Sequence, residues 1–401
     1  MSILRRKCIS FQSLFNHPSC IFNKIQYNQT VIIAEIGTAH GGSVEKGEQL
    51  ITAASEAGAD AVKFQWVYAD EILHPDTGFV KLPGGSIPLY ERFRQLEVPS
   101  SFFAHMLEYA HAKKVQFICS PFGLKSLDEL LSIHPDAVKI ASPEVNHFPM
   151  LKALAAYRSG QEKAGKEKVP VIISSGVSKL GDIEKALDIL GTDNCTLLHC
   201  ITCYPAPEDE YNIRVVQSLH DIFGIPTGIS DHSLDPVLVP SLATAYGGTV
   251  TEKHITLSRK TDGLDDPVAL EPEQFALMVH CIHQSQAALH RYGTERGRTE
   301  ILKQLSEQYD MAKIQAVAGN GIKHLAPSET ANYGRTNRSL HFMHAMKKGD
   351  IIHPEDIAVL RTEKILSPGI SPEYLDTVTG ACVTQDITAG SGVQWEYLLC
   401  R

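Results

Sequence analysis

The 401-residue sequence has no run of about 18 consecutive apolar residues, the length a helix needs to cross a membrane. We therefore expect a soluble protein. Basic residues are not concentrated anywhere: 37 Lys and Arg are scattered among 46 Asp and Glu, and the formal net charge is -9. We therefore expect no positively charged surface patch that could bind the phosphate backbone of a nucleic acid. The nine cysteines are odd in number and irregularly spaced, and no secretory signal accompanies them, so free thiols and a cytoplasmic location are favoured.

Acidic residues are absent from residues 1–30, whereas Arg5, Arg6, Lys7 and Lys24 are basic. A transit-like leader, a start codon placed too early and a poorly ordered N-terminal arm all fit this composition. We treat residues 1–30 as an N-terminal extension and expect the fold to begin near Val31.

Short apolar segments recur after this point, and a stretch with helical periodicity follows each of them. No G-x-G-x-x-G follows the first segment, which counts against a doubly wound dinucleotide-binding sheet. Alternating segments of this kind predict parallel strands joined by right-handed crossovers, and eight of them over about 250 residues match a (β/α)8 TIM barrel of the α/β class. The segments are 31–36, 61–64, 115–119, 138–141, 171–173, 196–199, 227–229 and 249–254.

The pattern changes after the eighth segment. Residues 273–315 are mostly helical in periodicity, and their charged part interrupts the apolar face. We assign residues 31–290 to the barrel domain and 291–334 to a linker that wraps or leaves it. Residues 335–401 contain short strand-like segments with Gly and Pro between them, which predicts a small second domain.

Polar residues are concentrated where the predicted strands end. In a (β/α)8 barrel these ends and the loops after them form the active-site face. Two lysines and several hydroxyls at the strand ends would form a cationic, donor-rich ring suited to a small anion with a phosphate and a carboxylate. The residues of this ring are Lys63, Ser120, Lys139, Ser142, Ser174 and Ser230.

Two histidines stand at the ends of the last two strands. Because neighbouring strands lie about 4.8 Å apart, His232 and His254 are close enough to bind one divalent ion. Glu252 precedes His254 by two residues and faces the same side. Core or loop histidines without a metal are the alternative. Cys200 and Cys203 form a single C-x-x-C, for which core packing is favoured over zinc binding or redox chemistry.

Several strand-end motifs together resemble the sialic acid synthase family, which joins phosphoenolpyruvate to an N-acylated amino sugar to make a nine-carbon ulosonic acid. The resemblance spans residues 31–266. Its motifs are Glu35-Ile36-Gly37 with His40, Lys63-Phe64-Gln65, Ser120-Pro121-Phe122, Val138-Lys139-Ile140, Ser230-Asp231-His232 and Glu252-Lys253-His254. The C-terminal segment resembles the antifreeze-like, β-clip domain of that family, through Arg338-Ser339-Leu340, Lys348-Gly349-Asp350 and Ser367-Pro368-Gly369.

The resemblance implies roles for individual residues. Phosphoenolpyruvate would be held by Lys63, Ser120, Lys139, Ser142, Ser174 and Ser230. The amino sugar would be oriented by Gln65, Tyr204, Glu252, Asp265 and Arg361. His232 and His254 would bind Mn²⁺ or Mg²⁺, and Glu35 would handle protons at the reacting carbons. The family also implies a homodimer in which the C-terminal domain of one subunit caps the barrel of the other.

Two other functions are compatible with the same barrel. A Schiff-base pyruvate aldolase would use Lys63 or Lys139 as its nucleophile, because the interior of a barrel can lower the pKa of a lysine. A catalytically inactive glycan-binding protein is the third reading, but the C-terminal segment has no obvious flat array of Thr or aromatic residues to support it.

Overall fold

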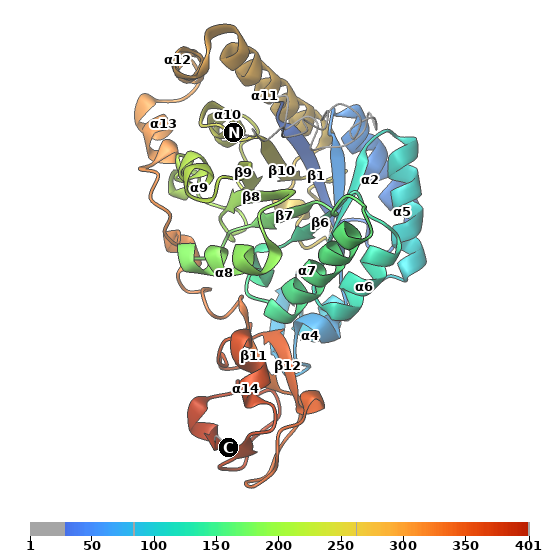
Figure 1. Cartoon of the computed structure of the whole chain (residues 1–401). Coiled ribbons are helices and arrows are strands. Elements are labelled where there is room, and N and C mark those ends of the chain that lie inside the picture. The colour runs from blue at the N-terminus through green and yellow to red at the C-terminus, as the bar shows by residue number, and fades with distance from the viewer. Residues whose placement is uncertain (1–28, 83–84, 262, 400–401) are drawn as a thin grey trace, which may run out of the picture.

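A closed barrel of eight parallel strands forms the larger part of the molecule (Figure 1). The computed structural model describes residues 29–82, 85–261 and 263–399. Neighbouring strands follow the order β1-β10-β9-β8-β7-β6-β5-β2 around the barrel. They are β1 (Val31–Gly37), β2 (Ala61–Trp66), β5 (Gln116–Pro121), β6 (Ala137–Ile140), β7 (Val171–Ser174), β8 (Cys195–Cys200), β9 (Thr227–Asp231) and β10 (Val250–His254). The predicted (β/α)8 fold is confirmed, and the expectations for residues 1–28 lie outside the described residues.

Alternate residues of each strand face the helices and the barrel interior. The outward set, which includes Ile32, Val62 and Phe117, packs with the helices in the main hydrophobic core. The inward set forms a separate apolar layer of Val31, Ile33, Ala61, Ile118, Ala137, Ile172, Leu198 and Val250. Because side chains alternate along a strand, the residue two positions further on occupies the next interior layer, nearer the carboxyl ends of the strands.

Helices cover the outside of the barrel. The helical stretch after the first strand is α2 (Val44–Glu56), and the Ser43 hydroxyl caps it by accepting a hydrogen bond from Lys46 N at 3.1 Å. The other helices of the barrel are α5 (Ser100–Ala112), α6 (Leu124–Ser132), α7 (Phe148–Lys163), α8 (Leu180–Leu190), α9 (Val215–Phe223), α10 (Leu238–Ala245) and α11 (Pro272–Tyr292). The sequence did not predict the insertion after β2, which contains α3 (Ala69–Ile72), the hairpin β3 (Phe79–Leu82) and β4 (Gly85–Pro88), and α4 (Leu89–Arg94).

Two further helices wrap the barrel. They are α12 (Thr294–Leu305) and α13 (Met311–Ala318), within the stretch assigned to a linker. Ile301, Leu305 and Ile314 are buried against Leu242 of α10 in a second core cluster. The first part of the predicted linker therefore belongs to the outer layer of the barrel. The actual connection between the two domains is the segment after α13, which contains only one short 3-10 helix (Pro327–Glu329).

The predicted small C-terminal domain has its own core. Strands β11 (Arg338–Phe342) and β12 (Ile357–Arg361) pair antiparallel, as do β13 (Cys382–Val383) and β14 (Leu398–Leu399), and α14 (Leu375–Val378) lies between the two pairs in sequence. Leu340, Phe342, Val378 and Val393 are buried together in this domain.

The C-terminal domain lies against one side of its own barrel, near α4, α7 and α8 (Figure 1). Several of its contacts are with segments that follow barrel strands: the Arg338 guanidinium donates hydrogen bonds to the carbonyl oxygens of Glu71 and Phe122, and Leu73 forms a β-bridge with Arg361. The domain thus borders the carboxyl-end face of the barrel. Within the described ranges, no helix has the length and hydropathy required to cross a membrane.

Candidate active site

The interior layer above the apolar layer is polar, and it is buried. This layer contains residues that stand two positions after the apolar ones on their strands, and none of them is more than 4% exposed. They include Glu35, Lys63, Ser120, Lys139, Ser174 and Glu252. Strand register sets neighbours side by side: Glu35 pairs with Lys63 of β2 and with His254 of β10. The structure therefore brings together residues that the sequence placed at separate strand ends.

Lys63 lies between two carboxylates. Its Nζ is 3.0 Å from Glu35 Oε2 and 3.4 Å from Glu252 Oε1. Burial alone would lower the pKa of Lys63, but Glu252 and Glu35 outweigh burial and the net pKa is raised. Burial likewise opposes ionisation of Glu252, yet Lys139 and Lys63 lower its pKa to about 2. The predicted cationic ring is thus partly neutralised by two carboxylates of the same layer, which the sequence did not predict.

Lys139 has a different environment. Its Nζ donates hydrogen bonds to Ser174 Oγ at 2.7 Å and to the Ile140 carbonyl oxygen at 3.1 Å, and it forms no ion pair with any of the described residues. Burial lowers the pKa of Lys139 to about 8; the charge of Glu252 opposes this shift and the charge of Lys63 adds to it. This ammonium group has no carboxylate in contact with it and is therefore the strongest candidate partner for an incoming anion.

Hydroxyl groups complete the polar layer. Among the described residues, Ser120 Oγ is buried without a hydrogen-bond partner. Ser230 donates to Glu252 Oε1 at 2.9 Å, and Ser142 Oγ accepts from Gly176 N at 3.0 Å. A Cβ atom on Gly176 would overlap the Thr202 hydroxyl and lie 2.9 Å from Ser142 Oγ, so only glycine allows this packing. Ser120 in particular has an unused donor directed into the layer.

The residues predicted to orient a sugar fall into two places. Gln65 Nε2 donates to Glu35 Oε1 at 2.8 Å, and Asp265 Oδ2 is 4.0 Å from His254 Nδ1. Gly37, at φ +56°, leaves the space between these side chains open. Glu252 lies instead with Lys63 and Ser230, beside the residues predicted to hold the anion.

The two predicted metal ligands are neighbours. The ring centroids of His232 and His254 are 5.6 Å apart, and the half-exposed Tyr204 ring stacks on His232 at 4.2 Å. His232 Nδ1 is 2.7 Å from the Ile201 carbonyl oxygen. Because a carbonyl only accepts, Nδ1 carries a proton and Nε2 is the nitrogen that faces a ligand. Burial would lower the pKa of His232, but Cys200 and the Ile201 carbonyl oxygen raise it to about 9, so a metal ion at Nε2 would displace a proton. No group of three or more His, Cys, Asp or Glu suited to a metal occurs within residues 29–82, 85–261 and 263–399. The two imidazoles fit an ion that takes its other ligands from water and substrate.

Arg361 reaches the mouth of the barrel through an ion pair that the sequence did not predict. Glu144, which is fully buried, accepts from Arg361 Nη2 at 2.6 Å and from Arg338 Nε at 2.5 Å. Burial would raise the pKa of Glu144, but the two arginines lower it. The domain that carries Arg361 lies on its own barrel, where Arg361 binds Glu144 in the segment after β6. The homodimer stays a prediction.

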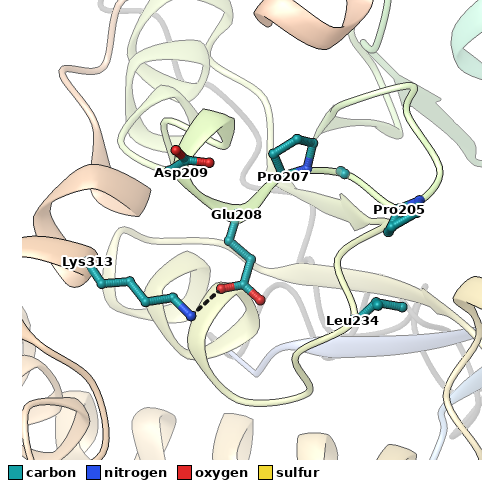
Figure 2. A pocket seen from close by; sticks show the side chains of 7 residues that line it. Pro205, Pro207, Glu208, Asp209, Leu234 and Lys313 are labelled. Atoms are coloured by element: carbon teal, nitrogen blue, oxygen red, sulfur yellow. Dashed lines mark ion pairs between the residues drawn. The ribbon is translucent and has the colours of Figure 1, made fainter.

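A pocket of about 460 Å³ lies outside the polar layer, between the loops after β8 and β9 and helix α13. Figure 2 shows Pro205, Pro207 and Leu234 on one side and the 2.7 Å ion pair between Glu208 and Lys313 on the other. One lining residue, Pro205, directly follows Tyr204 in sequence, but none of the predicted site residues lines the pocket.

Comparison with known proteins identifies the family. A family model described as the NeuB family matches residues 50–293, more than half of the chain. The chain belongs to the NeuB family. A second model, the SAF domain, matches residues 337–399 and so coincides with the small C-terminal domain.

Relatives resemble both domains of this NeuB-family protein, and two of them do so over nearly its whole length. It is 31% identical to the spore coat polysaccharide biosynthesis protein SpsE of Bacillus subtilis over 376 residues, 92% of this chain and 94% of the relative. The crystal structure of SpsE has a TM-score of 0.75 and covers 93% of this chain and 96% of its own. N,N'-diacetyllegionaminic acid synthase of Legionella pneumophila is 29% identical, over 92% of this chain and 94% of the relative. The structure of N-acetylneuraminic acid synthetase of Leptospira borgpetersenii, solved with citrate, has a TM-score of 0.58 at 27% identity. The match covers 71% of this chain and 93% of the synthetase.

Proposed function

We propose that this NeuB-family protein condenses phosphoenolpyruvate with an N-acylated amino sugar and water, giving a nonulosonic acid and phosphate. The acceptor is N-acetylmannosamine or a 6-deoxy diacetamido analogue. The names of the relatives, which are synthases of N,N'-diacetyllegionaminic and N-acetylneuraminic acid, support the reaction type. The observation that carries the proposal is the buried polar layer, in which Lys63 and Lys139 stand among hydroxyl groups at the carboxyl ends of the strands.

Phosphoenolpyruvate binds in this layer. Lys139, which has no carboxylate in contact, takes one anionic group of the substrate, and the free Ser120 hydroxyl donates a further hydrogen bond. Ser142, Ser174 and Ser230 lie in the same layer and add hydroxyls. Lys63 stays protonated between its carboxylates and contributes a fixed positive charge.

The sugar lies on the side of Gln65, Tyr204 and Asp265. The methylene carbon of phosphoenolpyruvate attacks the aldehyde carbon of the open-chain sugar and forms the new C–C bond. Positive charge develops on the adjacent carbon, water adds there and loses a proton, and phosphate leaves with cleavage of the C–O bond. Glu35, held by Lys63 at 3.0 Å and Gln65 at 2.8 Å, stabilises the positive charge and accepts the proton of the water. Arg361 would reach the N-acyl group from the edge of the mouth.

His232 and His254 would hold a divalent ion, Mn²⁺ or Mg²⁺. Such an ion polarises the oxygen of the sugar aldehyde when it is bound. The protein's own part is to fix the two imidazoles: the Ile201 carbonyl oxygen holds His232, Tyr204 packs on its ring, and Asp265 lies 4.0 Å from His254.

Removal of either histidine tests this assignment. His232→Ala and His254→Ala should each lower Mn²⁺ affinity by about 10- to 100-fold or more and lower turnover together with it, because each removes one of two protein ligands. Calorimetric titration of Mn²⁺ and a phosphate-release assay measure the two effects. His105→Ala, at an exposed position on α5, is the control. A chelated wild-type enzyme that keeps its full rate would contradict the metal role.

The lowered pKa of Lys139 predicts that the use of phosphoenolpyruvate depends on pH. The ammonium form persists below pH 8 and is lost above it, since the pKa is lowered to about 8. kcat/KM for phosphoenolpyruvate should therefore fall about tenfold per pH unit above this value. A pH–rate profile of the wild type shows this limb, and Lys139→Ala should lack it. A wild-type profile that is flat up to about pH 10 would contradict the role of Lys139.

Activity with a panel of sugars tests the function itself. The protein is incubated with Mn²⁺ or Mg²⁺, phosphoenolpyruvate and each of several N-acylated mannose and altrose derivatives, and both phosphate and product mass are recorded. We expect phosphate release that depends on at least one sugar, together with a new keto acid. No release with any acceptor would end the proposal and leave the aldolase and glycan-binding alternatives.

A Schiff-base aldolase is the second candidate, and the lowered pKa of Lys139 is the observation that favours it. Lys63 does not suit this role, because its two carboxylates keep it protonated. Borohydride reduction in the presence of pyruvate would trap a covalent adduct on Lys139 if the aldolase reading were right, and chelators would not affect it.

A further inference from the structure

The segment between α13 and the C-terminal domain crosses the turn that follows β7. Three of its side chains bind the main chain of that turn. Lys323 Nζ donates to the Ser175 carbonyl oxygen at 2.8 Å, Glu329 Oε1 accepts from Val177 N at 2.7 Å, and Asn337 Nδ2 donates to the Val177 carbonyl oxygen at 3.0 Å. We call residues 323–337 the strap.

Glu329 is the most buried side chain among the three, at 1% exposed. Its Oε1 also accepts from Thr202 N at 2.7 Å, and its Oε2 accepts from Ala326 N at 3.1 Å. One carboxylate of the strap therefore binds the loops after two different barrel strands, β7 and β8. Hydrogen bonds from buried N–H groups to a carboxylate are about twice as strong as neutral ones.

Val177 explains why the turn requires these bonds. Its φ is +42°, in the left-handed region that a β-branched residue strongly disfavours. A residue keeps such a conformation only when its surroundings determine it fully, and residues of this kind cluster at functional sites. Here the strap binds both polar groups of Val177: Glu329 takes the N–H and Asn337 the carbonyl oxygen.

The turn leads directly to the polar layer of the barrel. Ser174, three residues before Val177, accepts a hydrogen bond from Lys139. Gly176 donates to Ser142 Oγ and packs closely against the Thr202 hydroxyl. A change in the backbone at Val177 would therefore move the groups around Lys139.

We propose that Glu329 and Asn337 are positioning residues, which hold Val177 in its left-handed conformation and so set the hydroxyls around Lys139 for phosphoenolpyruvate. The inference rests on the proposed function and extends it to residues outside the barrel. It also ties the site to the C-terminal domain, because Asn337 directly precedes β11.

Steady-state kinetics of Glu329→Ala test the role. We expect KM for phosphoenolpyruvate to rise about tenfold or more, because a buried charged acceptor of three hydrogen bonds is lost. KM for the sugar should change by less than about threefold. Glu329→Gln, which keeps an acceptor for Val177 and Thr202, should recover most of the loss. Glu307→Ala, in the exposed turn after α12, is the matched control. Hydrogen exchange should become faster in peptides covering 174–178 and 200–203 of Glu329→Ala only.

Lower stability with an unchanged KM for phosphoenolpyruvate, or unchanged exchange in both peptides, would overturn the inference. If Glu329→Ala does not fold, Asn337→Ala decides in its place: a raised KM for phosphoenolpyruvate supports the role of the strap, and an unchanged one overturns it. If the wild type releases no phosphate with any sugar, the proposed function fails, and the exchange rates of the two peptides still test the strap.

Discussion

Lys139→Ala should lower kcat/KM for phosphoenolpyruvate by about 30-fold to several thousand-fold, equivalent to about 2 to 5 kcal/mol. The reason is the setting of this lysine. It is 1% exposed, bonded to the Ser174 hydroxyl and to a carbonyl oxygen, and no carboxylate contacts it. Glu252 acts on this charge without touching it, so the Lys139 ammonium group is free to contact the substrate, and its removal leaves an anionic group of the substrate buried without that partner.

Initial rates over a range of phosphoenolpyruvate concentrations measure this effect, and calorimetry measures the loss of affinity directly. Lys166→Ala is a suitable control, because Lys166 is exposed in the loop after α7. A Lys139→Ala enzyme that saturates with phosphoenolpyruvate as the wild type does would refute the assignment of this lysine.

Glu144→Ala should loosen the C-terminal domain from the barrel, with a loss of about 3 to 5 kcal/mol. Glu144 and Arg338 are both buried, and the carboxylate also binds Arg361. Loss of the carboxylate leaves two guanidinium groups facing each other without their counter-ion. The cost is that of uncompensated buried charge, which exceeds the net contribution of the intact ion pair.

Urea unfolding and limited proteolysis of the connection after α13 measure the loss. Glu373→Ala is the matched control, since Glu373 also joins the C-terminal domain to the barrel, through Lys185 at 2.9 Å, but on the exposed surface. Exposed pairs contribute only about 0 to 1 kcal/mol. Equal effects of the two substitutions would show that burial of Glu144 does not determine how the domain is held.

The fold and the members of the polar layer followed from the sequence because both depend on local periodicity. A strand of alternating inward and outward residues places Lys63 and Gln65 on one side whatever its partners are, and the same holds for Glu252 and His254. Eight repeats of strand and helix then leave few topologies besides a barrel.

The sequence did not predict which side chains of the layer pair with each other, because this pairing depends on the register between neighbouring strands. Glu35 neutralises Lys63 because β1 and β2 set these two residues opposite each other, and a single sequence does not fix that register. The sequence signal was present in part: two acidic residues stand at inward positions, Glu35 on β1 beside the strand of Lys63 and Glu252 on β10, one strand further round.

Contacts between distant segments were the least predictable. Glu144 and Arg338 are 194 residues apart, and Glu329 and Val177 are 152 apart. Both pairs depend on how the chain after α13 returns to the barrel, which no local pattern encodes. The left-handed Val177 was also invisible, because a β-branched residue in a sequence indicates an extended or helical backbone rather than a turn of this kind.

The central claim is that the protein condenses phosphoenolpyruvate with a sugar by cleavage of the C–O bond. Isotope labelling that identifies the broken bond tests this claim most directly. Substrate labelled with ¹⁸O at the bridging oxygen is turned over with an active sugar, and phosphate and keto acid are analysed by mass spectrometry. If water adds to the carbon next to the new C–C bond, as we propose with Glu35 accepting its proton, the label leaves with the phosphate. Label retained in the keto acid, or a sugar-dependent product formed from pyruvate alone without phosphate release, would contradict the account.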